Sequence, residues 1–239
     1  MTQPVNPGSP QWARELSKLR DVELSPRRAE LRRLANAVRG VLHRLVQTSA
    51  PVPMIAEAAD DLEGIVDRFR AHPNSSIYEG FAEAANAGDP FAFLDHSPML
   101  GHANPLAPPI EIWMEGEQVV GRARFDAAYE GPPGCVHGGY VAAAFDELLG
   151  STQSLSGAPG MTARLTVNYR SPTPLHTELR FVGNLDSVEG RKIHVSGELW
   201  AGDVLCAEAE GLFISMKPDR FAALKAQREQ QRLEQDAGA

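Results

Sequence analysis

The sequence predicts an α+β protein in which one helix packs against an antiparallel sheet. Two observations indicate this class. From residue 109 onward, short β-rich runs follow one another, and most of the connections between them have the length of a hairpin turn. One apolar segment of helical length interrupts the series after the second run. The order strand, strand, helix and four strands favours an antiparallel sheet over parallel βαβ units.

The predicted strands and the helix all lie between residues 110 and 216. Strands are expected at 110–115, 118–125, 162–169, 177–185, 192–200 and 204–216. Gly116 and Glu189-Gly190 are typical of tight turns between them. The helix is expected over about 139–155, where small and apolar residues predominate.

Two amphipathic helices are predicted upstream of the sheet. Ser25-Pro26 is typical of an N-cap followed by Pro at the first helical position, and apolar residues then recur every three or four positions to Leu45. A second apolar stripe runs from Ile55 to Phe69. The first of these helices is rich in arginine, which predicts a solvated basic face or, alternatively, a patch for anionic ligands. We therefore divide the chain into a helical extension and loop (1–105), the sheet domain (106–217) and a helical tail (218–239).

Composition excludes several classes of protein. The 239 residues carry 23 basic and 31 acidic side chains, a net charge of −8, which argues against nucleic acid as a partner. Cys135 and Cys206 are the only cysteines, too few for a disulfide framework or a four-cysteine zinc site. No apolar run approaches the roughly 20 residues of a membrane span. The polar, Pro-rich N-terminus does not resemble a signal peptide, so a cytoplasmic protein without a metal site is expected.

The middle of the predicted apolar helix contains two adjacent carboxylates, Asp146 and Glu147. A buried carboxylate costs several kcal/mol unless it is paired or functional. Either residue is therefore a candidate catalytic base. The alternative is that both lie on a solvent-facing edge or bind a neighbouring backbone.

The start of the same helix carries His137, Gly138 and Gly139. The first N–H groups of a helix have no partner within it and lie at the positive end of its dipole. Such groups suit a developing oxyanion, for example on a polarised thioester carbonyl. The alternative for the two glycines is a tight turn into the helix, and for His137 it is holding the loop by hydrogen bonds.

The spacing of these two groups predicts a homodimer. Seven residues separate Gly139 from Asp146, which is about 10 Å along a helix. A carboxylate at that distance cannot attack, or deliver water to, a carbonyl held at Gly139 of the same chain. If both groups serve one reaction, they must come from two antiparallel copies of the helix, related by a two-fold axis.

These residues resemble a known family. The run His137-Gly138-Gly139, with Asp146 nine positions after the histidine, is similar to the motif of hotdog-fold acyl-CoA thioesterases of the phenylacetate-pathway type. The preceding loop (129–136) and the later stretch (166–175) are also similar. The resemblance covers about residues 105–217.

The resemblance implies a curved antiparallel sheet wrapped around one long helix, and thioester hydrolysis without a metal or redox cofactor. It also implies acyl-CoA as the substrate and a homodimer or a dimer of dimers. By position, Asp146 matches the acidic residue that activates water or attacks, Gly139 the backbone donor and His137 the histidine beside it. Thr162 matches a hydroxyl that positions water. Gly131 stands where some members have an asparagine, so that side chain is missing here.

Some residues keep two interpretations. Glu147 remains an alternative to Asp146 as the working carboxylate. The candidate substrate-binding residues are Gly138, Tyr140 and Arg170, although Arg170 is also explained as a solvated strand end. Two other functions remain open on the same fold: a non-catalytic acyl-CoA-binding or regulatory protein, and an acyl-CoA hydratase.

Overall fold

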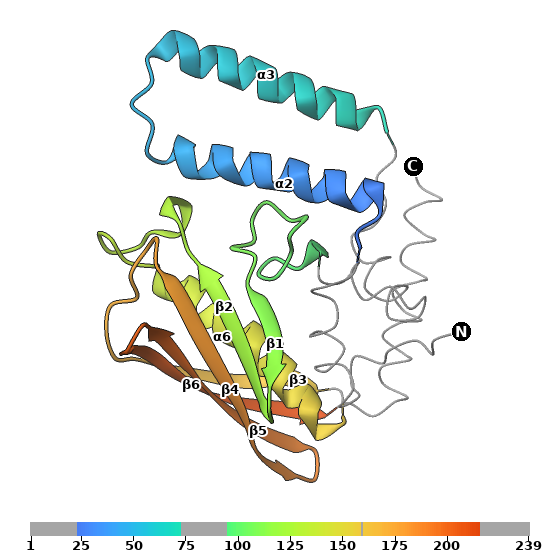
Figure 1. Ribbon diagram of the computed structural model, residues 1–239, viewed down its shortest axis with the longest axis vertical. Coiled ribbons are helices and arrows are strands. Elements are labelled where there is room, and N and C mark those ends of the chain that lie inside the picture. The colour runs from blue at the N-terminus through green and yellow to red at the C-terminus, as the bar shows by residue number, and fades with distance from the viewer. Residues whose placement is uncertain (1–22, 73–94, 159, 216–239) are drawn as a thin grey trace.

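The computed structural model describes residues 23–72, 95–158 and 160–215 (Figure 1). The predicted helical tail (218–239) lies outside the described residues, as do the first 22 residues and part of the predicted loop before residue 105.

Six strands form one antiparallel sheet in the order β1-β2-β4-β5-β6-β3, so β1 and β3 are its edges. The strands are β1 (Glu111–Glu115), β2 (Gln118–Arg124), β3 (Gly160–Tyr169), β4 (Glu178–Glu189), β5 (Lys192–Ala201) and β6 (Val204–Ser215). The predicted series is confirmed. The largest difference is at the end of β4, which continues four residues further than expected. The register shift between Leu185 and Ser187 keeps β4 paired with β5 up to the tight turn at Gly190.

Helix α6 (Gly138–Gln153) packs across one face of this sheet (Figure 1). Phe145 and Leu148 are completely buried, and the Phe145 ring meets Phe181 of β4 edge-on with 5.8 Å between ring centroids. Glycines on the facing strands allow this close approach. A Cβ atom at Gly197 would lie 3.1 Å from the Leu149 side chain, and one at Gly183 would overlap the Thr152 hydroxyl. The predicted single helix against an antiparallel sheet is therefore confirmed.

The two N-terminal helices, α2 (Pro26–Leu45) and α3 (Val52–Arg70), are also as predicted. Ser25 is the N-cap of α2, and its hydroxyl accepts a hydrogen bond from the Arg28 amide. The basic face of α2 is only partly solvated, because Arg28 and Arg32 both bind the buried carboxylate of Asp95, at 2.9 and 2.7 Å. By contrast, α3 has no buried residue.

Arg39 fixes α2 to the sheet domain. Its buried guanidinium donates hydrogen bonds to the carbonyl oxygens of Ala107 (2.8 Å) and Asn104 (2.9 Å). Upstream of these carbonyls, Met99 and Leu100 lie in the same core as β1 and α6. The core thus begins before the predicted domain boundary at residue 106, and α2 is attached to the segment that precedes β1.

We expect Arg39→Met to destabilise the docking of α2 by about 1–3 kcal/mol, because two carbonyl groups lose their donor inside a packed interface. Methionine retains much of the apolar stem, so packing loss contributes little. Amide hydrogen exchange should become faster throughout α2, and it should change much less in α6. Arg33→Met is the matched control, since the Arg33 side chain is exposed and pairs only with Glu30 among the described residues. Equal exchange in the two variants would contradict this role of Arg39.

Candidate active site

The loop before α6 is shaped to present His137. The amide of Gly131 donates to the Cys135 carbonyl (2.9 Å), and the Glu130 carboxylate accepts from the amide of Gly134 (2.7 Å), which has a positive φ of 74°. A Cβ atom at Gly131 would lie 2.7 Å from the His137 Cα, so a larger residue there would displace the histidine. The asparagine of some hotdog members thus has no room in this loop as it is folded here.

His137 is the N-cap of α6. Its Nδ1 atom accepts a hydrogen bond from the Gly139 amide at 3.0 Å, the usual bond from an N-cap side chain to the second or third residue of a helix. The expectation that the Gly139 N–H is unpaired is therefore wrong. Within the part of the chain that the structure describes, the N–H of the preceding residue, Gly138, has no hydrogen-bond partner. The sequence pattern does not reveal this bond, because a histidine is not among the usual N-cap residues.

Asp146 and Thr162 are brought together from α6 and β3. The Thr162 hydroxyl donates to the Asp146 carboxylate at 2.8 Å, and both residues are exposed. Thr162 immediately precedes an irregularity in the pairing of β3 with β6, between residues 162 and 164. Because β3 is an edge strand, this pair lies at an open side of the sheet.

Glu147 has a different environment. Its carboxylate accepts a hydrogen bond from the Ser97 hydroxyl at 3.1 Å, and that hydroxyl in turn accepts from the amides of Met99 and Leu100. Burial raises the pKa of Glu147. These contacts attach the segment 95–100 to α6, so the geometry gives Glu147 a structural role and leaves Asp146 as the accessible carboxylate.

The remaining predicted residues lie around the start of α6 or beyond it. The Tyr140 ring packs edge-on against Tyr129, with 4.9 Å between centroids, and near His137 at 6.4 Å. Arg170 forms an ion pair with Glu208, in agreement with a solvated strand end. Tyr169, at the end of β3, donates its hydroxyl to the Gly138 carbonyl at 2.7 Å. Its position at the end of a strand, just before a Ser-Pro turn, gave no local signal of this contact.

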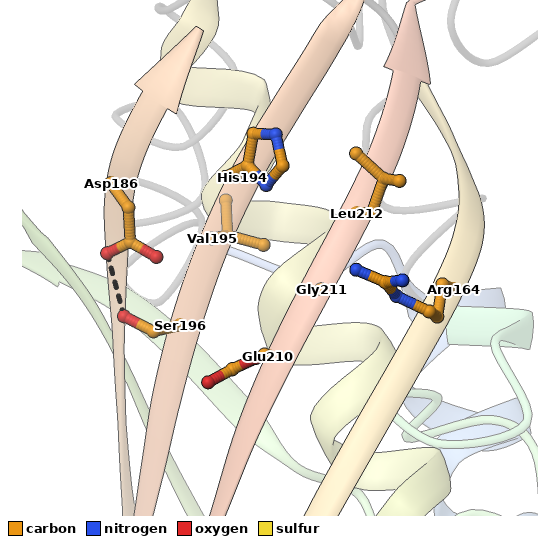
Figure 2. A pocket seen from close by; sticks show the side chains of 8 residues that line it. All are labelled: Arg164, Asp186, His194, Val195, Ser196, Glu210, Gly211 and Leu212. Carbon is orange, nitrogen blue, oxygen red and sulfur yellow. Dashed lines mark hydrogen bonds between the residues drawn. The ribbon is translucent and has the colours of Figure 1, made fainter.

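A shallow pocket lies elsewhere, on the sheet face opposite α6 (Figure 2). Its lining includes Arg164, Asp186, His194, Ser196 and Glu210, and Asp186 accepts a hydrogen bond from Ser196. None of the predicted site residues lines it.

Two features are absent from the described residues, a membrane-spanning helix and a cluster of metal-binding side chains. No helix in that part of the chain is long and apolar enough to cross a membrane. No group of three or more His, Cys, Asp or Glu side chains is placed there to hold a metal ion.

Known proteins resemble this chain in sequence. The family model of the Thioesterase superfamily matches residues 133–207, which include His137, Asp146 and Thr162. Acyl-coenzyme A thioesterase THEM4 of Bos taurus is 39% identical over 93 residues, 38% of this chain and 38% of that protein. Acyl-coenzyme A thioesterase THEM5 of Homo sapiens is 30% identical over 90 residues, 37% of this chain and 36% of that protein. The chain thus spans about two fifths of the length of these curated relatives.

A solved structure extends the likeness beyond residues 133–207. The crystal structure of a protein described as a thioesterase superfamily protein is 32% identical, with a TM-score of 0.66. The match covers 77% of this chain and 94% of the other. Identity at this level over nearly a whole relative, together with the family match at the start of α6, shows that this chain belongs to the thioesterase superfamily.

Proposed function

We propose that this chain hydrolyses acyl-CoA thioesters to a free acid and CoA, and that it acts as a homodimer. The observation that carries the mechanism is the exposed Asp146 carboxylate, which accepts a hydrogen bond from Thr162. It lies on the helix whose first N–H, at Gly138, has no partner among the described residues. The curated relatives named as acyl-coenzyme A thioesterases support the choice of substrate class.

In the proposed reaction, the thioester carbonyl lies at the start of α6. The Gly138 N–H donates to the carbonyl oxygen and stabilises the negative charge that develops there during attack. The proposal retains the expected backbone donor but moves it from Gly139 to Gly138, because the Gly139 N–H is already bound to His137. His137 lies beside this donor and offers its second ring nitrogen.

Asp146 supplies the nucleophile. It either removes a proton from water as the water attacks the carbonyl carbon, or attacks that carbon itself. In the first route, collapse of the tetrahedral intermediate releases the free acid, and the CoA thiolate takes up the proton that Asp146 removed from water. In the second route, collapse expels the thiolate and leaves an acid anhydride between Asp146 and the acyl group, which water then hydrolyses to the free acid and the Asp146 carboxylate, while the thiolate takes up the proton that this water releases. Thr162 fixes the carboxylate, and its hydroxyl lies where it can also contact the attacking water.

The dimer follows from the length of α6. Asp146 lies eight residues after Gly138, which is about 12 Å along the helix. At that distance, the carboxylate cannot act on a thioester held by the N–H of its own helix. In the proposed dimer, the carboxylate of one copy acts on the thioester held by the helix start of the other, and a two-fold axis generates two such sites. The open edge strand β3, beside the exposed Asp146 and Thr162, gives the second copy a place to pair.

The first test is the release of CoA from short-chain, long-chain and aromatic acyl-CoA substrates. We expect at least one class to be hydrolysed, with the free thiol measured by a chromogenic disulfide. Binding of acyl-CoA without release of thiol would contradict hydrolysis and favour the binding protein. Hydration of a 2-enoyl-CoA without release of thiol would instead favour the hydratase.

A further inference from the structure

Consecutive hydrogen bonds connect the end of β3 to the ring of His137. The Tyr169 hydroxyl donates to the Gly138 carbonyl oxygen at 2.7 Å. That carbonyl belongs to the same peptide unit as the Gly139 N–H, which donates to His137 Nδ1 at 3.0 Å. One peptide unit, between two glycines, therefore links a tyrosine on the edge strand to the histidine of the site.

This arrangement determines which nitrogen of the neutral His137 ring carries the proton. A backbone N–H is only a donor, so the Nδ1 atom that it meets must be an acceptor. The neutral imidazole then carries its proton on Nε2, an assignment that follows from the hydrogen-bond network. In the described part of the chain, Nε2 has no hydrogen-bond partner, and the His137 side chain is exposed. The free end of the ring is thus an N–H donor.

Tyr169 restrains the Gly138–Gly139 peptide unit, on which the position of the His137 proton depends. Glycine has more backbone freedom than other residues, and here two glycines flank one peptide bond. The phenol lies against Gly138, where a Cβ atom would be 3.1 Å from its oxygen. A donor at the carbonyl end of a peptide also polarises its N–H, which strengthens the bond to His137 Nδ1.

We propose that Tyr169 is a positioning residue that orients the Gly138–Gly139 peptide and thereby fixes His137 as the Nε2–H tautomer. His137 then presents a second N–H donor beside that of Gly138 to the oxygen of the thioester. The catalytic consequence rests on the function proposed above. The hydrogen bonds from Tyr169 to Gly138 and from Gly139 to His137, called the relay below, can be tested without turnover.

The experiment compares the wild-type chain with Tyr169→Phe, which removes the hydroxyl and keeps the ring. Thr166→Val is the matched control, because it removes a hydroxyl from the opposite face of the same strand. Nitrogen-15 NMR of histidine-labelled protein reports the tautomer of His137, whose signals are assigned by their loss in His137→Gln. Hydrogen exchange of the Gly139 amide and the values of kcat and KM complete the set.

We expect unprotonated Nδ1 and protonated Nε2 in the wild-type protein and in Thr166→Val. In Tyr169→Phe, the two nitrogen signals should move toward averaged values and the Gly139 amide should exchange faster. The kcat should fall about tenfold, and KM should change less than about twofold. The reason is that removal of the Tyr169 hydroxyl disturbs the orientation of the His137 N–H donor toward the thioester oxygen.

Each possible result has a definite meaning. A proton on Nδ1 in the wild-type chain would overturn the tautomer assignment. Unchanged nitrogen signals and Gly139 exchange in Tyr169→Phe would overturn the role of Tyr169, even if thioesters are hydrolysed. If the signals respond but no thioester is hydrolysed, the relay stands and the proposed function fails.

Discussion

Replacement of Asp146 by asparagine is expected to lower kcat for thioester hydrolysis by about 10²–10⁴-fold, the usual contribution of a general base. Asparagine has the same shape, and its side-chain oxygen can still accept the hydrogen bond from Thr162. The fold and the binding of acyl-CoA should therefore be retained. Circular dichroism and the dissociation constant for a non-hydrolysable acyl-CoA analogue check both, while release of CoA measures the loss.

Glu147→Gln is the matched variant, since it makes the same chemical change one residue further along the helix. Its amide oxygen still accepts from Ser97, so the segment 95–100 should stay attached to α6. We expect hydrolysis to be nearly unchanged. If Glu147→Gln abolished hydrolysis and Asp146→Asn did not, the catalytic carboxylate would be Glu147.

The role of Asp146 can then be resolved with isotopic water. In a single turnover in ¹⁸O-water with excess enzyme, direct attack followed by opening of the anhydride at the Asp146 carbon would place a carboxylate ¹⁶O atom in the product acid and ¹⁸O in Asp146. Activation of water would place ¹⁸O in the acid from the first turnover. The same chain serves for both outcomes, so no substitution disturbs the site.

Mixing two inactive variants is expected to restore activity. Gly138→Pro removes the N–H of the first helical residue, a position where proline is well tolerated. The added Cβ atom would lie 3.1 Å from the Tyr169 hydroxyl oxygen, so the Tyr169 side chain must shift by a few tenths of an ångström. The preceding His137 already has an extended backbone, with φ −60° and ψ 131°, which suits a residue before proline. This variant and Asp146→Asn should each form inactive dimers. If the site draws its donor and its carboxylate from different copies, a mixed dimer contains one complete site and one doubly defective site.

Mixed dimers can be isolated by co-expressing the two variants with different affinity tags. We expect them to have about half the wild-type activity per dimer, since one of two sites is intact. Sedimentation checks that the mixed protein is a dimer. Wild-type chains co-expressed with the same two tags give the reference activity. Inactive mixed dimers would show that the donor and the carboxylate of one site come from the same chain, and a monomeric protein with full activity would contradict the shared site directly.

The sequence by itself determined the order of the elements and the segment that carries the chemistry. The β-rich runs, the hairpin-length turns between them, the apolar segment of helical length and the Ser25-Pro26 helix start are local signals, and they predicted the six strands, α2 and α6. The run His137-Gly138-Gly139 and the two central carboxylates identified the helix of interest. The same local reasoning kept open that His137 holds its loop by hydrogen bonds, as it does toward Gly139.

The resemblance in sequence already favoured Asp146 over Glu147, but it could not show what either side chain contacts. Asp146 and Glu147 are adjacent carboxylates. Thr162 on β3 contacts the first, and Ser97, which lies 50 residues before Glu147 in the chain, contacts the second. Tyr169 reaches Gly138 across 31 residues. These contacts depend on the register of β3 against β6 and on the rotation of α6 over the sheet. Residue periodicity specifies which face of an element is buried, whereas side-chain hydrogen bonds between elements require their positions in three dimensions.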